Sequence, residues 1–357
     1  MRTLIVGGGL SGLAIAERLQ AEGLDYLLVE ARDRFGGRIK TVRMSGAAFD
    51  LGPAWFWPGQ PRMAALVDRL GLEKFDQFAD GLLTFEDERG QVQRGRGFAS
   101  MQGSWRLDGG FGALIDALVT RLPAAHLRLT APVTALAKTD RGLVATLQGG
   151  DEVHAGRVIL ALPPRVAANI AFAPALPEAT VQAMMGIATW MAGQAKALAL
   201  YDRPFWRAAG LSGDAMSRFG PMVEVHDASP RRGGPYGLFG FIGAAPQDRR
   251  DLERLQRQIL AQFVRLFGDA AANPLQLYIE DWARAPFTAT GADCAPLQAH
   301  PRYGLPRDMT GLWDGRVHFA GTEAAPHFGG YLEGALEAAE NLLGTLRDEE
   351  VSAGHVD

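Results

Sequence analysis

The stretch VGGGLSGL at residues 6–13 decides the fold of this chain. An apolar run at residues 2–6 predicts a buried parallel strand before it, and apolar residues at helical spacing within residues 11–24 predict a helix after it. Gly7, Gly9 and Gly12 match the pattern G-x-G-x-x-G. In that pattern the turn brings the backbone close to a pyrophosphate, and the last glycine lets the helix pack on the strand. Strand, glycine turn and helix together predict a dinucleotide-binding unit.

A second predicted strand, residues 26–29, ends on Glu30. The carboxylate of Glu30 is placed to accept hydrogen bonds from both hydroxyls of an adenosine ribose. Gly36-Gly37-Arg38 follows and predicts a second close approach of the backbone with a cation beside it, which suits a diphosphate. These residues would serve FAD and NAD equally, so the choice of cofactor depends on the rest of the chain.

The composition is that of an ordinary globular protein with roughly two domains. The 357 residues are 47% hydrophobic and 21% charged, with a formal net charge of -4. This mild charge and the scattered arginines give no reason to expect nucleic acid. Cys294 is the one cysteine, so no intramolecular disulfide can form, and no apolar run approaches the length of a membrane span. With a strand predicted from residue 2, we expect no leader peptide, no membrane partner and a cytoplasmic location.

Strands and glycine turns recur later in the chain. Residues 152–162 predict a strand that two prolines end, which indicates a crossing between domains. Residues 195–201 predict a strand whose apolar interior carries Lys196. Near the C-terminus, residues 317–320 predict a strand, and a helix opens after Gly330. The N-terminus of that helix would again face an electron-rich group.

Together these motifs resemble those of the flavin-containing amine oxidases of the monoamine oxidase type. The resemblance spans both ends and the middle of the chain: residues 7–30, 36–38 and 50–55, Lys196 followed by Pro204-Phe205-Trp206, Trp282, and residues 320–323 and 330–335. It implies FAD rather than NAD. Where the family commonly has a long helical insertion, this chain has only residues 79–107, as in a short, bacterial-like member with a reduced substrate domain.

The resemblance implies an α/β fold with a Rossmann-like FAD-binding domain of the monoamine oxidase type and a second, smaller α+β substrate domain. We expect the FAD-binding domain to be discontinuous and to consist of residues 1–78, 108–165 and 279–357. Residues 79–107 and 166–278 would form the substrate domain. A reduced substrate domain would leave the cavity more open. In a homo-oligomer, another subunit would complete the cavity wall.

The resemblance also implies cofactor-binding roles, position by position. Gly7, Gly9 and Gly12 would hold the pyrophosphate, Glu30 and Arg32 the adenosine ribose, Gly36, Gly37 and Arg38 the diphosphate and ribityl side, Val133 the adenine through its backbone, and Glu323 the ribityl chain or pyrophosphate. Gly52, Ala54, Trp55 and Trp282 would lie beside the isoalloxazine, and Gly330, Tyr331 and Leu332 at its pyrimidine end. Ser11, Ala31, Pro53, Gly321 and Ala335 belong to the same predicted cofactor-binding set.

Lys196 and Tyr331 are the predicted catalytic residues. A lysine in an apolar strand is costly unless it is paired or has a task, although a lysine at a strand edge can also extend to solvent. In the family that Lys196 resembles, the matching lysine holds a water against flavin N5, and the spacing to residues 204–206 favours this role. The usual aromatic partner of Tyr331 falls at Ala292, which leaves Phe287, Tyr303 or Phe328 as replacements.

The cysteine that carries a covalent flavin in some members of the family falls at Gly291, three residues before Cys294. We therefore expect FAD to be bound noncovalently. No metal site is expected, and no His/Asp or Ser/His constellation for acid–base or nucleophilic chemistry stands out.

The predicted reaction is hydride transfer from a neutral amine to flavin N5. The resulting imine would hydrolyse to an aldehyde or keto product, and O2 would reoxidise the flavin to give H2O2. Two alternatives stay open: a related flavoprotein that oxidises or desaturates a carotenoid, a porphyrinogen or a dihydronicotinamide, and a flavin-binding protein without turnover. The sequence does not choose between a monoamine, a polyamine and an amino acid as substrate.

Overall fold

The computed structural model describes residues 2–295, 297 and 299–353, and its base is a five-stranded parallel sheet. The strands run in the order β20-β13-β1-β2-β9, with every neighbouring pair parallel. Their bounds are β1 Thr3–Val6, β2 Tyr26–Val29, β9 Leu127–Arg128, β13 Arg157–Leu160 and β20 Val317–Phe319. All four residues of β1 are buried, as expected for a strand that is covered on both faces.

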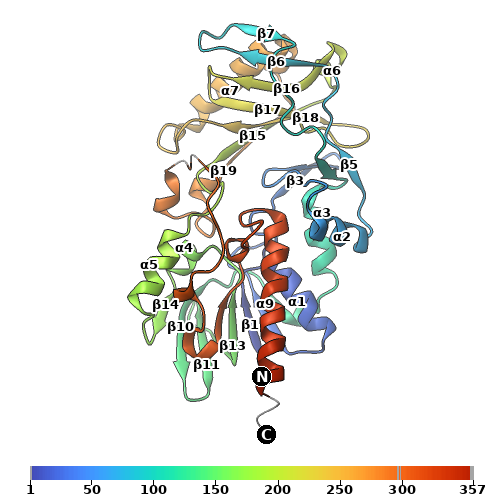
Figure 1. Cartoon of the computed structure of the whole chain (residues 1–357). Helices are drawn as coiled ribbons and strands as arrows, with labels where there is room; N and C mark the ends of the chain where they lie inside the picture. The colour runs from blue at the N-terminus through green and yellow to red at the C-terminus, as the bar shows by residue number, and fades with distance from the viewer. Residues whose placement is uncertain (1, 296, 298, 354–357) are drawn as a thin grey trace.

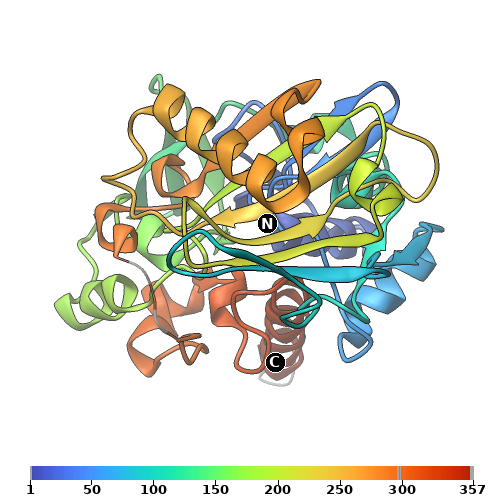
Figure 2. The ribbon, with the colours of Figure 1, turned by 90° about the horizontal axis from the view of Figure 1, so that it is seen from above.

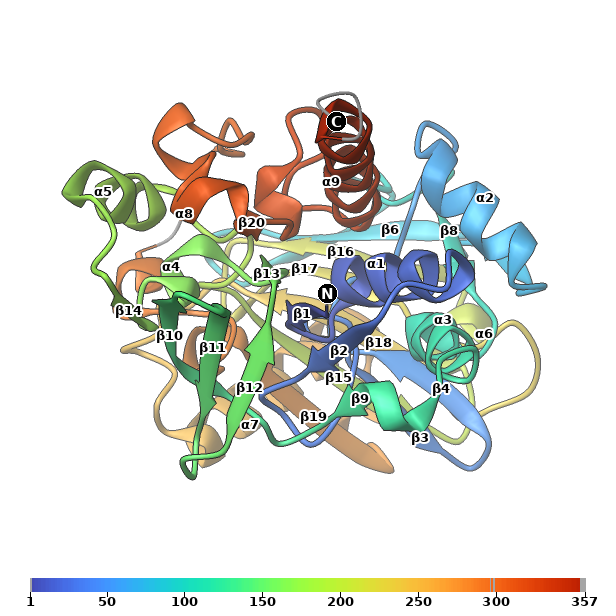
Figure 3. The same cartoon turned by 90° about the horizontal axis from the view of Figure 1, so that it is seen from below.

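Helices cover one face of this sheet, and α1 and α9 lie side by side on it (Figures 1 and 3). Their bounds, with those of two neighbours, are α1 Leu10–Ala21, α2 Pro61–Arg69, α3 Gly110–Val119 and α9 Leu332–Ala353. The opening strand, turn, helix and second strand thus follow the prediction from the glycine pattern. The α/β fold with a Rossmann-like unit is confirmed.

A four-stranded sheet with the order β12-β11-β10-β14 packs against the other face of the parallel sheet. Its strands are β10 Val133–Thr139, β11 Gly142–Leu147, β12 Glu152–Ala155 and β14 Ala171–Ala173, with α4 Pro164–Ala167, α5 Glu178–Gly186 and α8 Leu312–Gly315 nearby. The single strand predicted over residues 152–162 is therefore wrong. The chain leaves the four-stranded sheet at Gly156, whose N–H donates to the carbonyl of Arg2, and then enters the parallel sheet as β13.

The third layer is a seven-stranded sheet with the order β19-β15-β18-β17-β16-β6-β7. Its strands are β6 Leu82–Glu86, β7 Val92–Arg94, β15 Ala195–Tyr201, β16 Leu211–Ser217, β17 Met222–Asp227, β18 Tyr236–Ile242 and β19 Gln276–Asp281. The amphipathic helix α7 (Leu252–Phe267) covers the outer face of this sheet, as Figure 2 shows from above, and α6 (Phe205–Ala208) packs at β16. The inner face turns toward the nucleotide-binding part of the chain.

Two small antiparallel strand pairs connect these layers: the hairpin of β3 (Thr41–Met44) with β4 (Ala47–Asp50), and β5 (Lys74–Asp76) with β8 (Trp105–Leu107). The end of β4 leads into residues 51–55, whose apolar side chains pack against β15 and β18. Asp50 accepts hydrogen bonds from the N–H of Phe111 and from the Thr41 hydroxyl, and so ties this hairpin to the first turn of α3. The segment after β4 is thereby fixed between the parallel sheet and the seven-stranded sheet.

Our division into two domains stays a proposal. Strands β6 and β7, from residues 79–107, join strands from residues 195–281 in one sheet, whereas β14 and α5 pack with the four-stranded sheet.

Within the described residues, no helix is long and apolar enough to cross a lipid bilayer.

Candidate active site

A cavity of about 510 Å³ lies between the parallel sheet and the seven-stranded sheet. Its walls come from the turn after β1, the end of β2, the segments 36–39, 52–57 and 282–288, strands β15 and β18, and the start of α9. It extends from Glu30 at one end to Lys196 and Phe241 at the other. One elongated cavity thus joins the predicted nucleotide site to the predicted catalytic residues.

The nucleotide end is formed by close backbone packing. Gly7 has φ +110°, and a Cβ atom there would stand 2.6 Å from the carbonyl oxygen of Ala161. A Cβ on Gly12 would stand 2.0 Å from the carbonyl oxygen of Gly7, so α1 can pack on this turn only with glycine at that position. The predicted packing of the helix on the turn therefore has a geometric cause here, and Gly7 allows the turn to lie close to the segment after β13.

Glu30 is fixed at the end of β2 by two backbone donors. The N–H of Gly8 donates to Oε2 at 2.7 Å, and the N–H of Arg32 donates to Oε1 at 2.9 Å. Arg32 also lines the cavity, and its Nη2 donates to the hydroxyl of Thr288 at 2.8 Å. The carboxylate is thereby held at the cavity wall where a ribose could donate to it.

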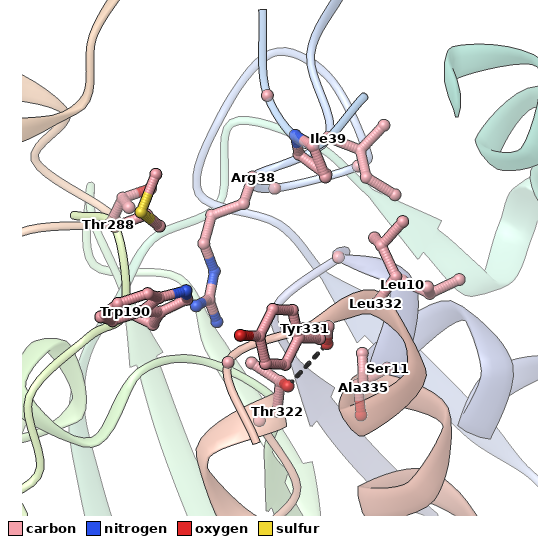
Figure 4. A pocket seen from close by; sticks show the side chains of 18 of the residues that line it. Leu10, Ser11, Arg38, Ile39, Trp190, Thr288, Thr322, Tyr331, Leu332 and Ala335 are labelled. Atoms are coloured by element: carbon pink, nitrogen blue, oxygen red, sulfur yellow. Dashed lines mark hydrogen bonds between the residues drawn. The ribbon is translucent and has the colours of Figure 1, made fainter. Parts of the chain in front are cut away.

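Arg38 supplies a cation to the middle of the cavity, where Figure 4 shows its guanidinium extending toward Trp190. Its Nη1 and Nη2 donate to Oε1 and Oε2 of Glu323 at 2.7 and 3.1 Å, and Glu323 is completely buried. Burial alone lowers the pKa of Arg38, but the facing carboxylate outweighs burial and raises the pKa overall. Glu323, predicted to contact the cofactor, lies behind Arg38 rather than in the cavity wall.

The opposite end is lined by aromatic rings around Lys196. Trp282 donates its indole N–H to the carbonyl of Leu51 at 3.1 Å, and Trp55 donates to Oε1 of Gln77 at 2.8 Å. Both tryptophans are buried, so their orientations are set by these bonds and by packing. Phe241, one strand away on β18, completes this part of the wall.

Lys196 lies on β15 with only 6% of its surface exposed, so the side chain does not extend to solvent. Its Nζ donates to the carbonyl of Gly52 and lies 5.1 and 5.0 Å from the ring centroids of Phe239 and Phe241. Burial lowers the pKa of Lys196 to about 7, and the negative charge of Asp50 opposes this only in part. Lys196 can therefore hold or release a proton near neutral pH.

Tyr331 stands at the start of α9 with 39% of its surface exposed, and its carbonyl accepts a hydrogen bond from the Thr322 hydroxyl at 2.8 Å (Figure 4). His300 stacks on its ring with centroids 5.0 Å apart and an angle of 7° between the planes. Trp190 meets His300 edge-on at 4.8 Å and lines the cavity beside Tyr331. Trp190 is thus an aromatic wall residue that our list of replacement rings did not include.

Among the three replacement rings that the sequence suggested, Phe287 lines the cavity. Tyr303 instead donates its hydroxyl to the carbonyl of Ala188 at 2.7 Å, and its ring fills the space beside Gly329. Cys294 is partly buried and does not line the cavity.

The fold brings most of the predicted site residues to this one cavity. Those that line it are Gly7, Gly9, Ser11, Glu30, Arg32, Gly36, Gly37, Arg38, Gly52, Pro53, Ala54, Trp55, Lys196, Trp282, Gly321, Gly330, Tyr331, Leu332 and Ala335. Four predicted residues do not line it: Gly12, Ala31, Val133 and Glu323. Gly12 packs closely against the carbonyl of Gly7, and Glu323 accepts hydrogen bonds from Arg38. Val133 begins β10 in the four-stranded sheet.

Sequence reasoning missed a further set of wall residues. They are Leu10, Ile39, Trp57, Gln60, Met101, Ala161, Leu162, Pro163, Trp190, Met191, Ala192, Phe241, Thr288 and Thr322. Two signals could have found some of them. Residues 161–163 follow the buried strand β13, and ligands of such sheets bind at the carboxyl ends of the strands. Phe241 stands in the same register as Lys196, but that pairing is visible only once the strands are aligned.

A family model described as flavin containing amine oxidoreductase matches residues 10–97 and 81–342. The chain is 28% identical to AofH of Mycobacterium tuberculosis, which is named as a flavin-containing monoamine oxidase, over 94% of each protein. It is 26% identical to the putrescine oxidase of Kocuria rosea over 96% of this chain and 95% of that protein.

Two solved structures share the fold across nearly the whole chain. A putrescine oxidase bound to putrescine superimposes with a TM-score of 0.82 at 22% identity, over 98% of this chain and 99% of the other. The cyclohexylamine oxidase from Brevibacterium oxydans superimposes with a TM-score of 0.79 at 20% identity, over the same shares.

Proposed function

The chain belongs to the flavin-containing amine oxidoreductase family, and from that premise we propose which step it performs and with which residues. As a member, it is a flavin-dependent amine oxidase with FAD as its cofactor. We propose that it takes a hydride from the carbon next to the nitrogen of a small-molecule amine, releases an imine that hydrolyses, and uses O2 as electron acceptor to give H2O2. The observation that carries this proposal is the single cavity that joins the glycine turn and Glu30 to the buried Lys196.

The residues present fit FAD. Gly7 and Gly9 line the cavity at the start of α1, where the N-terminus of the helix would face a pyrophosphate. Glu30 is fixed to accept hydrogen bonds from a ribose, and Arg38 offers a cation between the two ends of the cavity. We propose noncovalent binding, because Cys294 stands outside the cavity wall.

When bound, FAD supplies the hydride acceptor, and the chain's own residues prepare the substrate for that transfer. Trp55 and Trp282 exclude water from the end of the cavity around Lys196, which strengthens every electrostatic interaction there. The Nζ of Lys196, bonded to the carbonyl of Gly52, is placed to hold a water or a proton at that end. We propose that Tyr331 and Trp190 orient the amine through their ring faces.

One measurement tests the proposed reaction: anaerobic bleaching of the visible flavin spectrum by a panel of primary amines, diamines and amino acids, followed by peroxide detection on readmission of air. We expect bleaching by an amine and stoichiometric peroxide. Bleaching only by NADH or by an apolar polyene would contradict amine oxidation, and bleaching by an amine without peroxide would contradict O2 as acceptor. Acid precipitation should leave the yellow colour in the supernatant, whereas a coloured pellet would contradict noncovalent binding.

A further inference from the structure

The side chain of Tyr331 makes no hydrogen bond within the part of the chain that the structure describes. Its backbone is held, because the N–H donates to the carbonyl of Phe328 at 3.1 Å and the carbonyl accepts from the Thr322 hydroxyl at 2.8 Å. The side chains of Trp55 and Trp282, by contrast, are buried and donate to fixed acceptors. With 39% of Tyr331 exposed, the orientation of its ring depends on packing.

His300 supplies a packing surface for the ring of Tyr331. The imidazole lies parallel to that ring, with centroids 5.0 Å apart and an angle of 7° between the planes. Stacked rings at such a separation attract each other beyond the effect of the area that they bury. Tyr331 lines the cavity, whereas His300 does not. The imidazole therefore supports the ring without taking a place in the cavity wall.

His300 is an exposed residue, yet its imidazole is held on several sides. The Nε2 atom lies 3.0 Å from the carbonyl oxygen of Gly329, and it must carry the hydrogen because a carbonyl only accepts. The rings of Trp190 and Tyr303 meet the imidazole edge-on, with centroids 4.8 and 5.4 Å away and angles of 62° and 86° between the planes. One hydrogen bond and two neighbouring rings thus set the plane of the imidazole.

The two neighbouring rings are themselves fixed by the glycines that precede α9. A Cβ atom on Gly330 would stand 2.8 Å from the Cβ of Trp190, and Gly330 has φ +84°, which favours glycine. A Cβ on Gly329 would stand 2.3 Å from the Cβ of Tyr303. The hydroxyl of Tyr303 donates to the carbonyl of Ala188 at 2.7 Å. Direct backbone contact therefore gives the imidazole a rigid support.

We propose that His300 is a positioning residue for Tyr331, and that its stacked imidazole holds the tyrosine ring in the orientation in which it faces the amine. This inference rests on the proposed function, in which Tyr331 orients the substrate. Without the imidazole, the ring adopts the productive orientation in only a fraction of the molecules, and the apparent affinity for the amine falls by that fraction. Since His300 stands outside the cavity wall, the rate from the bound complex should change less.

The test measures kcat and KM on FAD-loaded protein. The probe is whichever of benzylamine, n-hexylamine, putrescine and L-phenylalanine reduces the wild-type flavin fastest. In His300→Ala we expect KM to rise about threefold to tenfold and kcat to change less than about twofold, as the loss of one aromatic pair predicts. His154→Ala, which removes an exposed histidine from β12, should leave both constants unchanged. A wild-type KM in His300→Ala would overturn the proposal.

Two conservative variants separate the stack from the hydrogen bond. His300→Phe keeps a ring on Tyr331 but loses the group that donates to the carbonyl of Gly329, whereas His300→Gln keeps a donor and loses the ring. We expect His300→Phe to restore KM to within about threefold of the wild type, and His300→Gln to behave like His300→Ala. The opposite order would overturn the stack as the cause and assign the effect to the backbone at Gly329.

A double-mutant cycle shows whether His300 acts through Tyr331. In the Tyr331→Ala background, His300→Ala should change kcat/KM by less than about twofold, because the ring that it positions is already gone. An equal fall in both backgrounds would mean that the two residues act independently, and would overturn the positioning role. Flavin absorbance and the thermal unfolding midpoint of each variant identify a folding defect separately.

Crystal structures of the wild type and of His300→Ala provide a measurement that does not depend on turnover. We expect one orientation of the Tyr331 ring in the wild type and more than one in the variant. A single, unchanged orientation in His300→Ala would overturn the proposal. Failure of every probe amine to reduce the wild-type flavin would instead remove the proposed function, and the ring orientation would still decide the role of His300.

Discussion

The two ends of the cavity are built in different ways. The nucleotide end is a backbone structure, in which Gly7, Gly12 and the fixed Glu30 lie within one stretch of the chain. The substrate end is a side-chain structure, assembled from strands β15 and β18 and from segments after β4 and before α9. The first tolerates almost no change of shape, whereas the second can change its chemistry by exchanging single side chains.

The most severe test of this difference between the two ends adds one methyl group at the nucleotide end. In Gly12→Ala the new Cβ would stand 2.0 Å from the carbonyl oxygen of Gly7, so α1 must move away from the turn. We expect loss of bound FAD on purification and a free energy of unfolding lower by about 1–3 kcal/mol or more. Gly186→Ala, where a Cβ meets nothing within 4 Å, is the matched control. Retention of FAD at the wild-type ratio in Gly12→Ala would refute the steric argument.

The substrate end should respond in rate rather than in binding. Lys196→Met keeps a long apolar side chain in β15 but removes the group that donates to the carbonyl of Gly52. We expect FAD to stay bound, and the rate of flavin reduction or of reoxidation to fall about a hundredfold. Stopped-flow absorbance measures both half-reactions, and Lys138→Met, at a half-buried lysine of β10 that pairs with Asp314, is the control. Wild-type rates in both half-reactions would exclude the proposed role.

The contrast also explains what the sequence could predict. The first strand, helix and second strand, with Glu30 at the end, follow from local spacing, because that unit is formed by consecutive residues. Trp190 and Phe241 had no such signal. Trp190 reaches the cavity from the segment before β15, and Phe241 does so only through its register with Lys196. Cross-strand register depends on tertiary packing, which a single sequence does not reveal.

Glu224 and His226 show the same limit more strongly. Each is an ordinary polar residue in a strand with mixed burial, and Asp214 stands ten residues before Glu224 on another strand. The side chains of Asp214, Glu224 and His226 come together behind Trp55 only in the folded chain. Lys196, by contrast, was predictable because a cation inside an apolar strand is unusual in any context.

Substitution of the buried Glu323 tests whether the nucleotide end depends on side chains that do not line the cavity. Glu323→Gln removes the charge that faces Arg38 and replaces one of the two oxygens that accept from its guanidinium with an NH2 group that cannot accept. We expect the affinity for FAD to fall about tenfold to thirtyfold, because the guanidinium loses its fixed position. Fluorescence titration of the apoprotein with FAD measures this. Glu22→Gln removes a carboxylate from an exposed pair with Arg18 and should leave FAD affinity unchanged, since surface pairs contribute little. Equal effects of the two substitutions would show that burial of the pair has no consequence for the cofactor.

We also expect a pH dependence that belongs to the substrate end alone. Lys196 releases its proton at about pH 7 in the folded chain, whereas its ordinary pKa is 10.5. Between these pH values the unfolded chain binds one more proton at this position, so the free energy of unfolding should rise with pH, by at most about 1.4 kcal/mol per unit. Lys196→Met has no such group, and the difference between wild type and variant cancels the other titrations. Denaturant unfolding from pH 7 to 10 measures that difference, which should grow in favour of the wild type. A difference that stays constant with pH would mean that Lys196 keeps its proton in the folded chain.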